Sequence, residues 1–189
     1  MQLWVGLGNP GAQYAMHRHN VGFMALDAIA ACHAFGAIAK KFHGWLQEGR
    51  LGGERILLLK PATFMNDSGR SVGEALRFYK LDLAALTVFH DELDLAPFKV
   101  KVKTGGGTAG HNGLRSIDQH VGPDFRRVRI GIGHPGHRDR VTGHVLGNYA
   151  KSEIEPLSDL LGAIAAESPW LAAGDDARFM NDVALRLTT

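Results

Sequence analysis

Short runs of apolar, β-prone residues alternate along the chain with longer segments whose apolar positions recur every three or four residues. Leu3-Trp4-Val5 and Leu86-Thr87-Val88-Phe89 are typical of buried strands, whereas Phe23, Leu26 and Ile29 recur at helical spacing. This order predicts an α/β fold, a sheet covered by helices. A chain of 189 residues can close its own core without metal or disulfide staples, so we expect one domain over residues 1–189.

Turn and capping signals predict further elements. Gly52-Gly53 separates two β-prone runs, as in a hairpin, and residues 99–103 alternate lysine and valine with the period of a half-exposed strand. Asn20 is expected to cap the first helix. Ser152 and Glu155 have the spacing of a capping box that opens a C-terminal helical region.

Cysteine content and hydropathy indicate the cellular compartment of the protein. Cys32 is the only cysteine, so no intramolecular disulfide is possible, and its alanine-rich setting predicts a small, buried helix residue. No apolar run approaches the roughly 18 residues of a membrane span, and the chain begins with a strand-like run instead of a charged and then apolar leader. We therefore expect a cytoplasmic protein without a membrane partner.

Positive charge is concentrated in one part of the chain. Residues 1–98 contain nine basic and nine acidic residues, whereas residues 99–151 contain ten Lys or Arg against three Asp, a net charge of +7. Residues 152–189 contain two basic and seven acidic residues, a net charge of −5. A local basic stretch indicates binding of a polyanion, and a solvated lysine-rich surface is the alternative.

Polar side chains follow several predicted strands, where ligands bind in open α/β sheets. His19 is a candidate general base, because histidine titrates near neutrality, and Asp91 is a candidate carboxylate to orient it. The amides of Asn9, Asn66 and Asn112 can stabilise a carbonyl oxygen that gains negative charge. Each of these residues could instead be an ordinary turn or cap residue.

Metal and nucleotide sites are less favoured. The ten histidines include no H-E-x-x-H or Cys/His spacing, and His17 and His19 project in different directions. The glycine-rich segment at residues 105–113 lacks the Gly-Lys-Ser/Thr ending of a P-loop and does not follow the first strand. The His-Asn pair within it favours a loop that faces substrate, with a flexible surface loop as the alternative. No cofactor or metal is expected.

Six motifs together resemble the bacterial peptidyl-tRNA hydrolase family, in order and over nearly the whole chain. They are Val5-Gly6-Leu7-Gly8-Asn9-Pro10-Gly11, Arg18-His19-Asn20-Val21-Gly22, Thr63-Phe64-Met65-Asn66-Asp67-Ser68-Gly69, His90-Asp91-Glu92-Leu93-Asp94-Leu95, the segment from Gly105 to Ile117, and Arg127-Val128-Arg129-Ile130-Gly131-Ile132-Gly133-His134-Pro135-Gly136. The resemblance implies a twisted mixed sheet flanked by helices on both sides. It also implies a monomer that hydrolyses the ester between peptide and tRNA, recycling drop-off products of translation.

The resemblance further implies a role for each site residue. His19 corresponds to the catalytic base, Asp91 to its orienting carboxylate, and Asn9, Asn66 and Asn112 to the asparagines that position the substrate carbonyl and water. The cleft for the terminal nucleotide and the peptide corresponds to Tyr14, Met65 and His111. The basic pair that grips the 5′ phosphate of the tRNA acceptor stem corresponds to Lys103 and Arg129.

The chain departs from the family pattern in two places, and two other functions stay open. His17 replaces a common threonine, and the spacer at residues 96–99 is shorter than usual, which puts the geometry of that loop in question. A non-catalytic RNA-binding protein on the same fold would bind peptidyl-tRNA without turnover. A hydrolase or phosphorylase of small nucleosides would not need the basic region.

Overall fold

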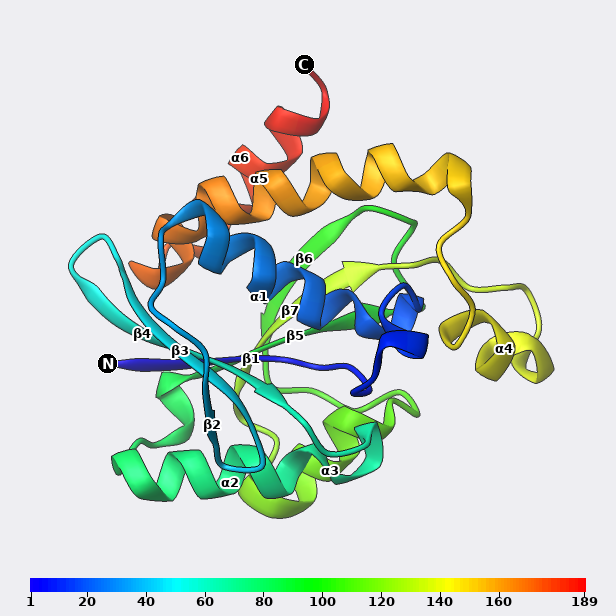
Figure 1. The fold of residues 1–189 in the computed structure, drawn as a ribbon. Coiled ribbons are helices and arrows are strands. Elements are labelled where there is room, and N and C mark those ends of the chain that lie inside the picture. The colour runs from blue at the N-terminus through cyan, green and yellow to red at the C-terminus, as the bar shows by residue number, and fades with distance from the viewer.

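The alternating apolar runs form one seven-stranded sheet in the computed structural model, which describes residues 1–189 (Figure 1). The strand order is β2-β3-β4-β1-β5-β7-β6. The central strands β4, β1, β5 and β7 are parallel, while β2, β3 and β6 run antiparallel to the strand beside them, so the sheet is mixed. The strands are β1 (Gln2–Gly6), β2 (Ala39–Lys41), β3 (Gly44–Leu51), β4 (Glu54–Pro61), β5 (Leu86–Glu92), β6 (Val100–Thr104) and β7 (Arg126–Gly131).

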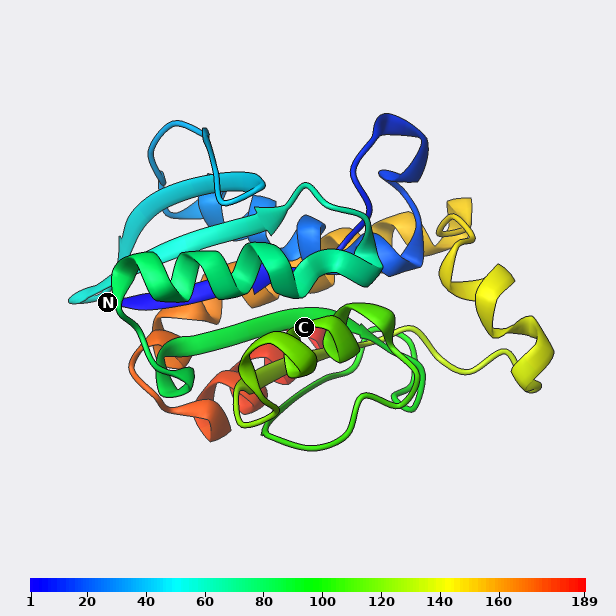
Figure 2. The ribbon, with the colours of Figure 1, turned by 90° about the horizontal axis from the view of Figure 1, so that it is seen from below.

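Helices cover both faces of the sheet, as predicted. On one face lie α2 and α3, and on the other α1, α5 and α6 (Figures 1 and 2). The short α4 lies apart from both layers, beyond the end at which the parallel strands finish (Figure 1). The helices are α1 (Val21–Cys32), α2 (Ser68–Tyr79), α3 (Asn112–Val121), α4 (Val141–Val145), α5 (Ile154–Ala172) and α6 (Asp176–Leu187). Short 3-10 helices span Ala12–Tyr14, Arg18–Asn20, Met65–Asp67, Leu83–Ala85, Arg138–Arg140 and Lys151–Glu153.

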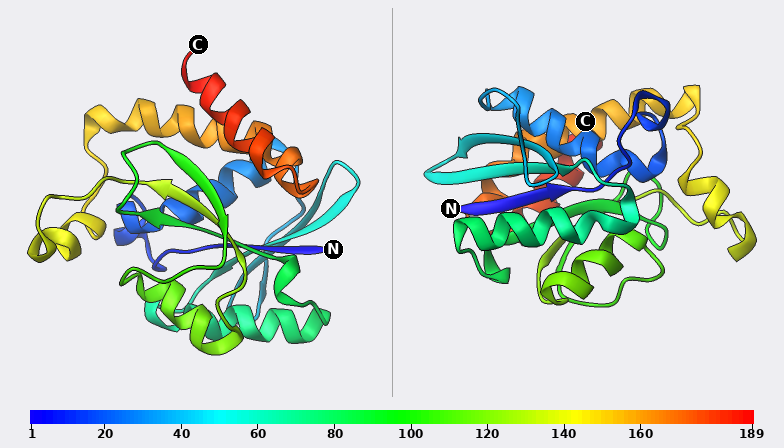
Figure 3. Two further views of the ribbon diagram at one scale, coloured as in Figure 1. Left: turned by 180° about the vertical axis from the view of Figure 1, so that it is seen from behind. Right: turned by 60° about the horizontal axis from the view of Figure 1, so that its bottom comes forward.

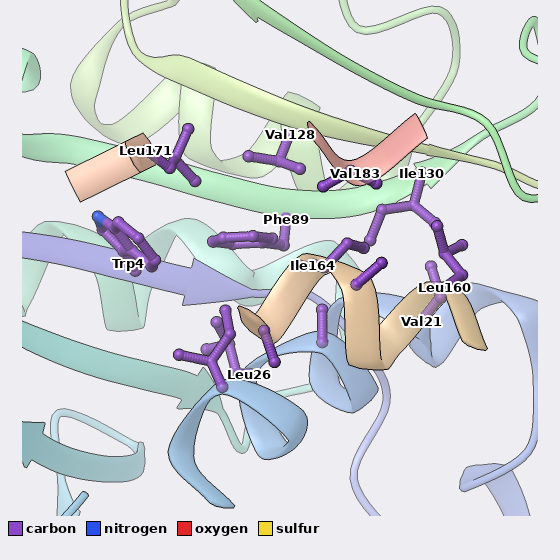
Figure 4. Close-up of a cluster of buried hydrophobic side chains, with 14 of the residues drawn as sticks. Trp4, Val21, Leu26, Phe89, Val128, Ile130, Leu160, Ile164, Leu171 and Val183 are labelled. Carbon is purple, nitrogen blue, oxygen red and sulfur yellow. The ribbon is translucent and has the colours of Figure 1, made fainter. Parts of the chain in front are cut away.

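Each face of the sheet has its own apolar core, because successive strand residues point to opposite faces. On the side of α1 and α5, the rings of Trp4 and Phe89 lie 5.5 Å apart and pack with Leu160 and Ile164 (Figure 4). A second core lies between the sheet and the pair α2 and α3. Burial on both faces explains why the central strands are continuous apolar runs in the sequence. None of the helices is both long enough and apolar enough to span a membrane.

Two local predictions are wrong. Cys32 is exposed because it is the last residue of α1, and the packing that buries this helix ends at Ala30. The capping interaction before α5 is made by Glu153, whose side chain accepts a hydrogen bond from the backbone N–H of Ala150 at 2.8 Å. The pair Ser152 and Glu155 does not form it, because the chain has already entered a 3-10 turn at residue 151.

Candidate active site

A cleft of about 660 Å³ opens at the end of the sheet where β1, β5 and β7 finish. Nine of the ten site residues predicted from the sequence line it: Asn9, His19, Met65, Asn66, Asp91, Lys103, His111, Asn112 and Arg129. Tyr14 does not line the cleft; its ring lies edge-on to that of His17, with centroids 5.4 Å apart. The parallel strands thus bring together residues that are more than a hundred positions apart in the sequence.

His19 and Asp91 meet at the centre of this cleft. His19 lies in the 3-10 helix before α1, and Asp91 lies near the end of β5. The Nδ1 atom of His19 is 2.8 Å from Oδ2 of Asp91, and both side chains are buried. Gly22 makes this approach possible, because a Cβ atom there would lie 2.3 Å from the carbonyl oxygen of Phe89. The start of α1 therefore rests directly on β5.

Asp91 also binds a second imidazole. Its Oδ1 atom is 2.8 Å from Nε2 of His111. The other ring nitrogen of His111, Nδ1, accepts hydrogen bonds from the backbone N–H groups of Gly113 (3.1 Å) and Leu114 (3.3 Å), at the start of α3. A nitrogen that accepts cannot carry a proton, so the proton of neutral His111 is on Nε2 and is donated to Asp91. Both carboxylate oxygens are thus occupied.

This arrangement separates the pKa values of the buried groups. Burial raises the pKa of Asp91. The positive charge that His111 and His19 each carry when protonated, together with the hydrogen bonds of both rings, outweighs burial and holds that pKa well below its usual range. Burial lowers the pKa of His19, but the charge and hydrogen bond of Asp91 outweigh it, and the pKa is raised. With Nδ1–H of His19 donated to Asp91, Nε2 is left to accept a proton.

A neighbouring histidine behaves in the opposite way. His90 is buried on β5, and burial lowers its pKa to about 3. Its Nδ1 atom lies 2.8 Å from the backbone carbonyl oxygen of Asp91, so Nδ1 carries the proton and donates it. His90 is therefore neutral and serves to hold the backbone beside Asp91.

The three groups at the centre also have the composition of a metal site. One ligand atom each from His19, Asp91 and His111 lie within 4.8 Å of one another. The tautomer of His111 argues against a metal ion, because its Nε2 could bind one only if Nδ1 took up the proton, and Nδ1 faces two N–H donors. These residues fit a hydrogen-bonded pair of imidazoles around one carboxylate better than a metal-binding set.

The orientation of the Asn9 amide is fixed by its neighbours. Its Oδ1 atom accepts the backbone N–H of Met65 at 2.8 Å, so its Nδ2 group is left to donate. Its backbone is held by Asn20, which accepts from the Asn9 N–H and donates to the Asn9 carbonyl oxygen, both at 2.9 Å. Asn20 occupies the N-cap position of α1 as predicted, but its side chain makes no capping bond. Asn66 and Asn112 line the cleft with exposed side chains.

The far wall of the cleft is formed by α4, and Arg18 links this helix to the turn that carries His19. Apolar side chains of Val145 and Leu146 line the cleft on this side. Arg18 precedes His19 and donates to the carbonyl oxygen of His144 at 3.2 Å and to Oε1 of Glu153 at 3.0 Å. The position of α4 is thereby coupled to the turn that carries His19.

The basic end of the cleft contains Lys103, Arg127 and Arg129. Arg129 lies 4.0 Å from Oε1 of Glu92. The guanidinium of Arg127 is buried and donates to the backbone carbonyl oxygens of the glycine-rich segment, at Gly106 (2.9 Å) and Gly107. Arg127 therefore anchors the loop that leads to His111.

Among the residues with evident roles in this arrangement, Arg127, His90 and Asn20 were not predicted as site residues. Arg127 could have been found from its spacing, since it lies two residues before Arg129 on a strand and shares its face. His90 had only its place beside Asp91 as a signal. The sequence contains no signal for the hydrogen bonds between Asn20 and Asn9, because an asparagine before a helix is already explained as a cap.

The chain is similar to known proteins over its full length. A family model described as peptidyl-tRNA hydrolase matches residues 3–188. A peptidyl-tRNA hydrolase of Novosphingobium aromaticivorans is 77% identical over 189 residues, covering 100% of this chain and 99% of that protein. One from Sphingopyxis alaskensis is 75% identical over 187 residues, covering 99% of each. The crystal structure of peptidyl-tRNA hydrolase from Acinetobacter baumannii has a TM-score of 0.90 and 42% identity, covering 97% of this chain and 94% of that one.

Proposed function

Because the chain belongs to the peptidyl-tRNA hydrolase family, it is a carboxylic ester hydrolase of peptidyl-tRNA, and we propose that His19 is its general base. The observation that carries the proposal is the double hydrogen bond of Asp91, which supports a single tautomer of His19 with Nε2 free to take a proton. The substrate ester joins the carboxyl end of a peptide to the terminal ribose of tRNA.

In the proposed reaction, Nε2 of His19 removes a proton from water as the water oxygen attacks the ester carbonyl carbon. Asp91 stabilises the imidazolium that forms. The amide Nδ2 of Asn9, with Asn112 and Asn66 on the same rim, donates to the carbonyl oxygen as it becomes an oxyanion. When the tetrahedral intermediate collapses, the ribose oxygen leaves and takes the proton back from His19. Free peptide and free tRNA are the products.

We propose that His111 holds Asp91 in position as well as lining the cleft. Its neutral tautomer donates to Asp91 and caps α3, so it supports the ionised carboxylate that His19 needs. Met65 is buried beneath the cleft, and its backbone N–H holds the Asn9 amide. Tyr14 lies outside the lining, so it would contact only a part of the substrate that extends beyond the cleft.

Recognition of the tRNA end is assigned to Lys103 and Arg129. Both line the cleft, and both belong to the basic region at residues 99–151. Phosphate contacts supply affinity that weakens with salt. Lys103→Ala or Arg129→Ala should therefore raise KM for full tRNA substrates, with little effect on a minimal ester without a 5′ phosphate. We further propose that the protein acts as a monomer in the cytoplasm, where peptidyl-tRNA arises.

The test is turnover of a purified peptidyl-tRNA by the wild type and by His19→Asn. Loss of an activated base lowers kcat by about 10²–10⁴-fold, with tRNA binding retained. His43→Asn is the matched control, since His43 lies on an exposed turn outside the cleft and pairs with Glu74. Unchanged kcat in His19→Asn would exclude the assignment. If the wild type binds peptidyl-tRNA but does not hydrolyse it, the protein is an RNA-binding protein. Activity on free nucleosides would instead indicate a nucleoside hydrolase or phosphorylase.

A further inference from the structure

The side chain of Arg18 joins the turn that carries His19 to the segment on either side of Tyr149. One guanidinium nitrogen donates to the carbonyl oxygen of His144 at 3.2 Å, and another donates to Oε1 of Glu153 at 3.0 Å. The guanidinium carbon lies 5.6 Å from the centroid of the Tyr149 ring. The side chain is 15% exposed, so solvent screens these contacts less than those of a surface ion pair. The planar guanidinium holds two acceptors in fixed directions, which an ammonium group does not do.

Backbone pairing makes the same connection. Residues 16–18 and 147–149 meet in an antiparallel bridge, and two backbone hydrogen bonds of 3.0 Å close it, one in each direction. A Cβ atom at Gly147 would lie 3.0 Å from Nη1 of Arg18, so the glycine lets the guanidinium lie against this segment. A displacement of one segment is therefore passed to the other.

The helix α4 depends on this connection for its place. It lies apart from the two helical layers (Figures 1 and 3), and it contacts the turn Arg18–Asn20 and the short 3-10 helix that precedes it. The hydrogen bonds that join it to residues outside 137–147 both involve His144. The carbonyl oxygen of His144 accepts from Arg18, and its Nε2 atom lies 3.0 Å from the carbonyl oxygen of Ile132.

The same helix and the residue after it face the cleft. Val141, Thr142, Val145 and Leu146 line the cleft, and Val145 also packs against the apolar core. Leu146 is 41% exposed, so it is accessible to an apolar side chain of a bound peptide. His19 lines the same cleft. A peptide in the cleft thus meets a helix whose backbone is bound by the residue before the base.

We propose that Arg18 is a positioning residue that passes contact between the peptide and α4 to His19. The inference rests on the proposed function and deepens it, because it makes turnover depend on the peptide beyond its ester-linked residue. Contact with the peptide holds α4, and through Arg18 it holds the turn in which Nδ1 of His19 faces Asp91. Binding energy from parts of the substrate remote from the ester thereby orients the base, so it raises kcat instead of only lowering KM.

The experiment compares N-acetylleucyl-tRNA with N-acetyltetraleucyl-tRNA, which share the tRNA and the ester-linked residue. The quantity measured is the ratio of the two single-turnover rate constants at saturating enzyme. In the wild type the longer peptide should react about tenfold faster or more, because it reaches α4. In Arg18→Gln the ratio should fall toward one, because contact with α4 no longer orients the base. Arg18→Lys keeps the charge but loses the fork of donors, so it should not restore the ratio.

Arg178→Gln is the matched control. Arg178 also lies beside a carboxylate, 3.5 Å from Asp182, and its guanidinium carbon lies 3.5 Å from the centroid of the Trp170 ring, but it belongs to α6, outside the cleft. This variant should keep the wild-type ratio. Partial unfolding lowers both rate constants by the same factor, so the ratio separates positioning from stability. Leu146→Ala should also lower the ratio, and adding it to Arg18→Gln should lower the ratio no further.

An Arg18→Gln variant with the wild-type ratio overturns the proposal, whatever its absolute activity, and so does a wild type whose rate does not depend on peptide length. If the wild type hydrolyses neither substrate, the proposed function fails, and hydrogen exchange tests Arg18 separately. A non-hydrolysable 3′-amide analogue of the longer substrate should then slow exchange at residues 141–149 and 16–20 in the wild type, but only at residues 141–149 in Arg18→Gln. Slower exchange at both segments in the variant would overturn the role of Arg18.

Discussion

Replacing Asp91 by asparagine tests the shared-carboxylate geometry most directly. The carboxylate accepts from Nδ1 of His19 and from Nε2 of His111, each at 2.8 Å. Asparagine offers only one acceptor oxygen, and its NH₂ group must face the other imidazole. The backbone N–H groups of Gly113 and Leu114 keep the proton of His111 on Nε2, so the amide oxygen turns to His111. The NH₂ group then faces His19 and forces its proton onto Nε2, the atom that must be free.

The magnitude follows from two contributions. Replacing the charge-assisted bond to the imidazolium by a neutral one costs about 1.5–3 kcal/mol. Restoring the base-competent tautomer turns the amide so that two donors face each other at His111, which costs about 2–3 kcal/mol more. At about 1.4 kcal/mol for each tenfold, the sum of about 3.5–6 kcal/mol should lower kcat by about 300-fold to 20,000-fold. KM should change little, because Asp91 is buried and both its carboxylate oxygens are bound by the imidazoles of His19 and His111.

The assay is single-turnover hydrolysis of peptidyl-tRNA under saturating enzyme, with Asp94→Asn on the cleft rim as the matched control. The double variant Asp91→Asn/His111→Asn provides an internal check. It removes the competing N–H donor while keeping a side chain that can cap α3, so it should recover about 10-fold or more of the activity lost in Asp91→Asn. A kcat within tenfold of the wild type in Asp91→Asn, or a double variant no faster than the single one, would refute the tautomer argument.

Three further predictions follow from the same region. The acid limb of the kcat/KM profile should have an apparent pKa above 6.5, because the base must be neutral to act. At His19 the pKa is lowered by burial, but Asp91 raises it by more. A pH–rate profile with its acid limb at or below 6.5 would contradict this. The pKa of His90 falls from 6.5 unfolded to about 3 folded, so its stabilising effect is complete above pH 6.5 and is lost as the pH falls toward 3. Between pH 6.5 and 4 the free energy of unfolding should fall by roughly 3 kcal/mol, and His90→Asn should flatten this fall as measured by urea unfolding. If the variant shows the same fall, a group other than His90 causes it. Arg127→Met should lower the free energy of unfolding by about 2–4 kcal/mol and raise hydrogen exchange in residues 105–111, whereas Arg115→Met on the exposed side of α3 should do neither.

Much of the fold follows from local patterns. The hairpin at Gly52-Gly53, the strand of alternating lysine and valine and the buried strand before His90 are confirmed, because each depends on residues within one element. Predictions about the burial of single residues were less secure, because burial depends on what packs against each residue. Cys32 is exposed although its neighbours are alanines, because the packing that buries α1 ends at Ala30. The strand order was expected from the family resemblance, since periodicity does not report which strands are neighbours.

The main helices and strands, the basic region and the set of chemically capable side chains can be read from the sequence, because they depend on residue type and short-range spacing. The pairing of those side chains depends on the folded chain. Parallel packing of β1 and β5, with Gly22 allowing α1 to rest on β5, brings His19 to Asp91 across 72 positions of chain. The folded chain also brings a second imidazole, that of His111, to Asp91. Asn20, predicted as a helix cap, instead binds the backbone of Asn9. Hydrogen-bond partners and protonation states are properties of atoms within about 3 Å of each other, and only the folded chain sets those distances.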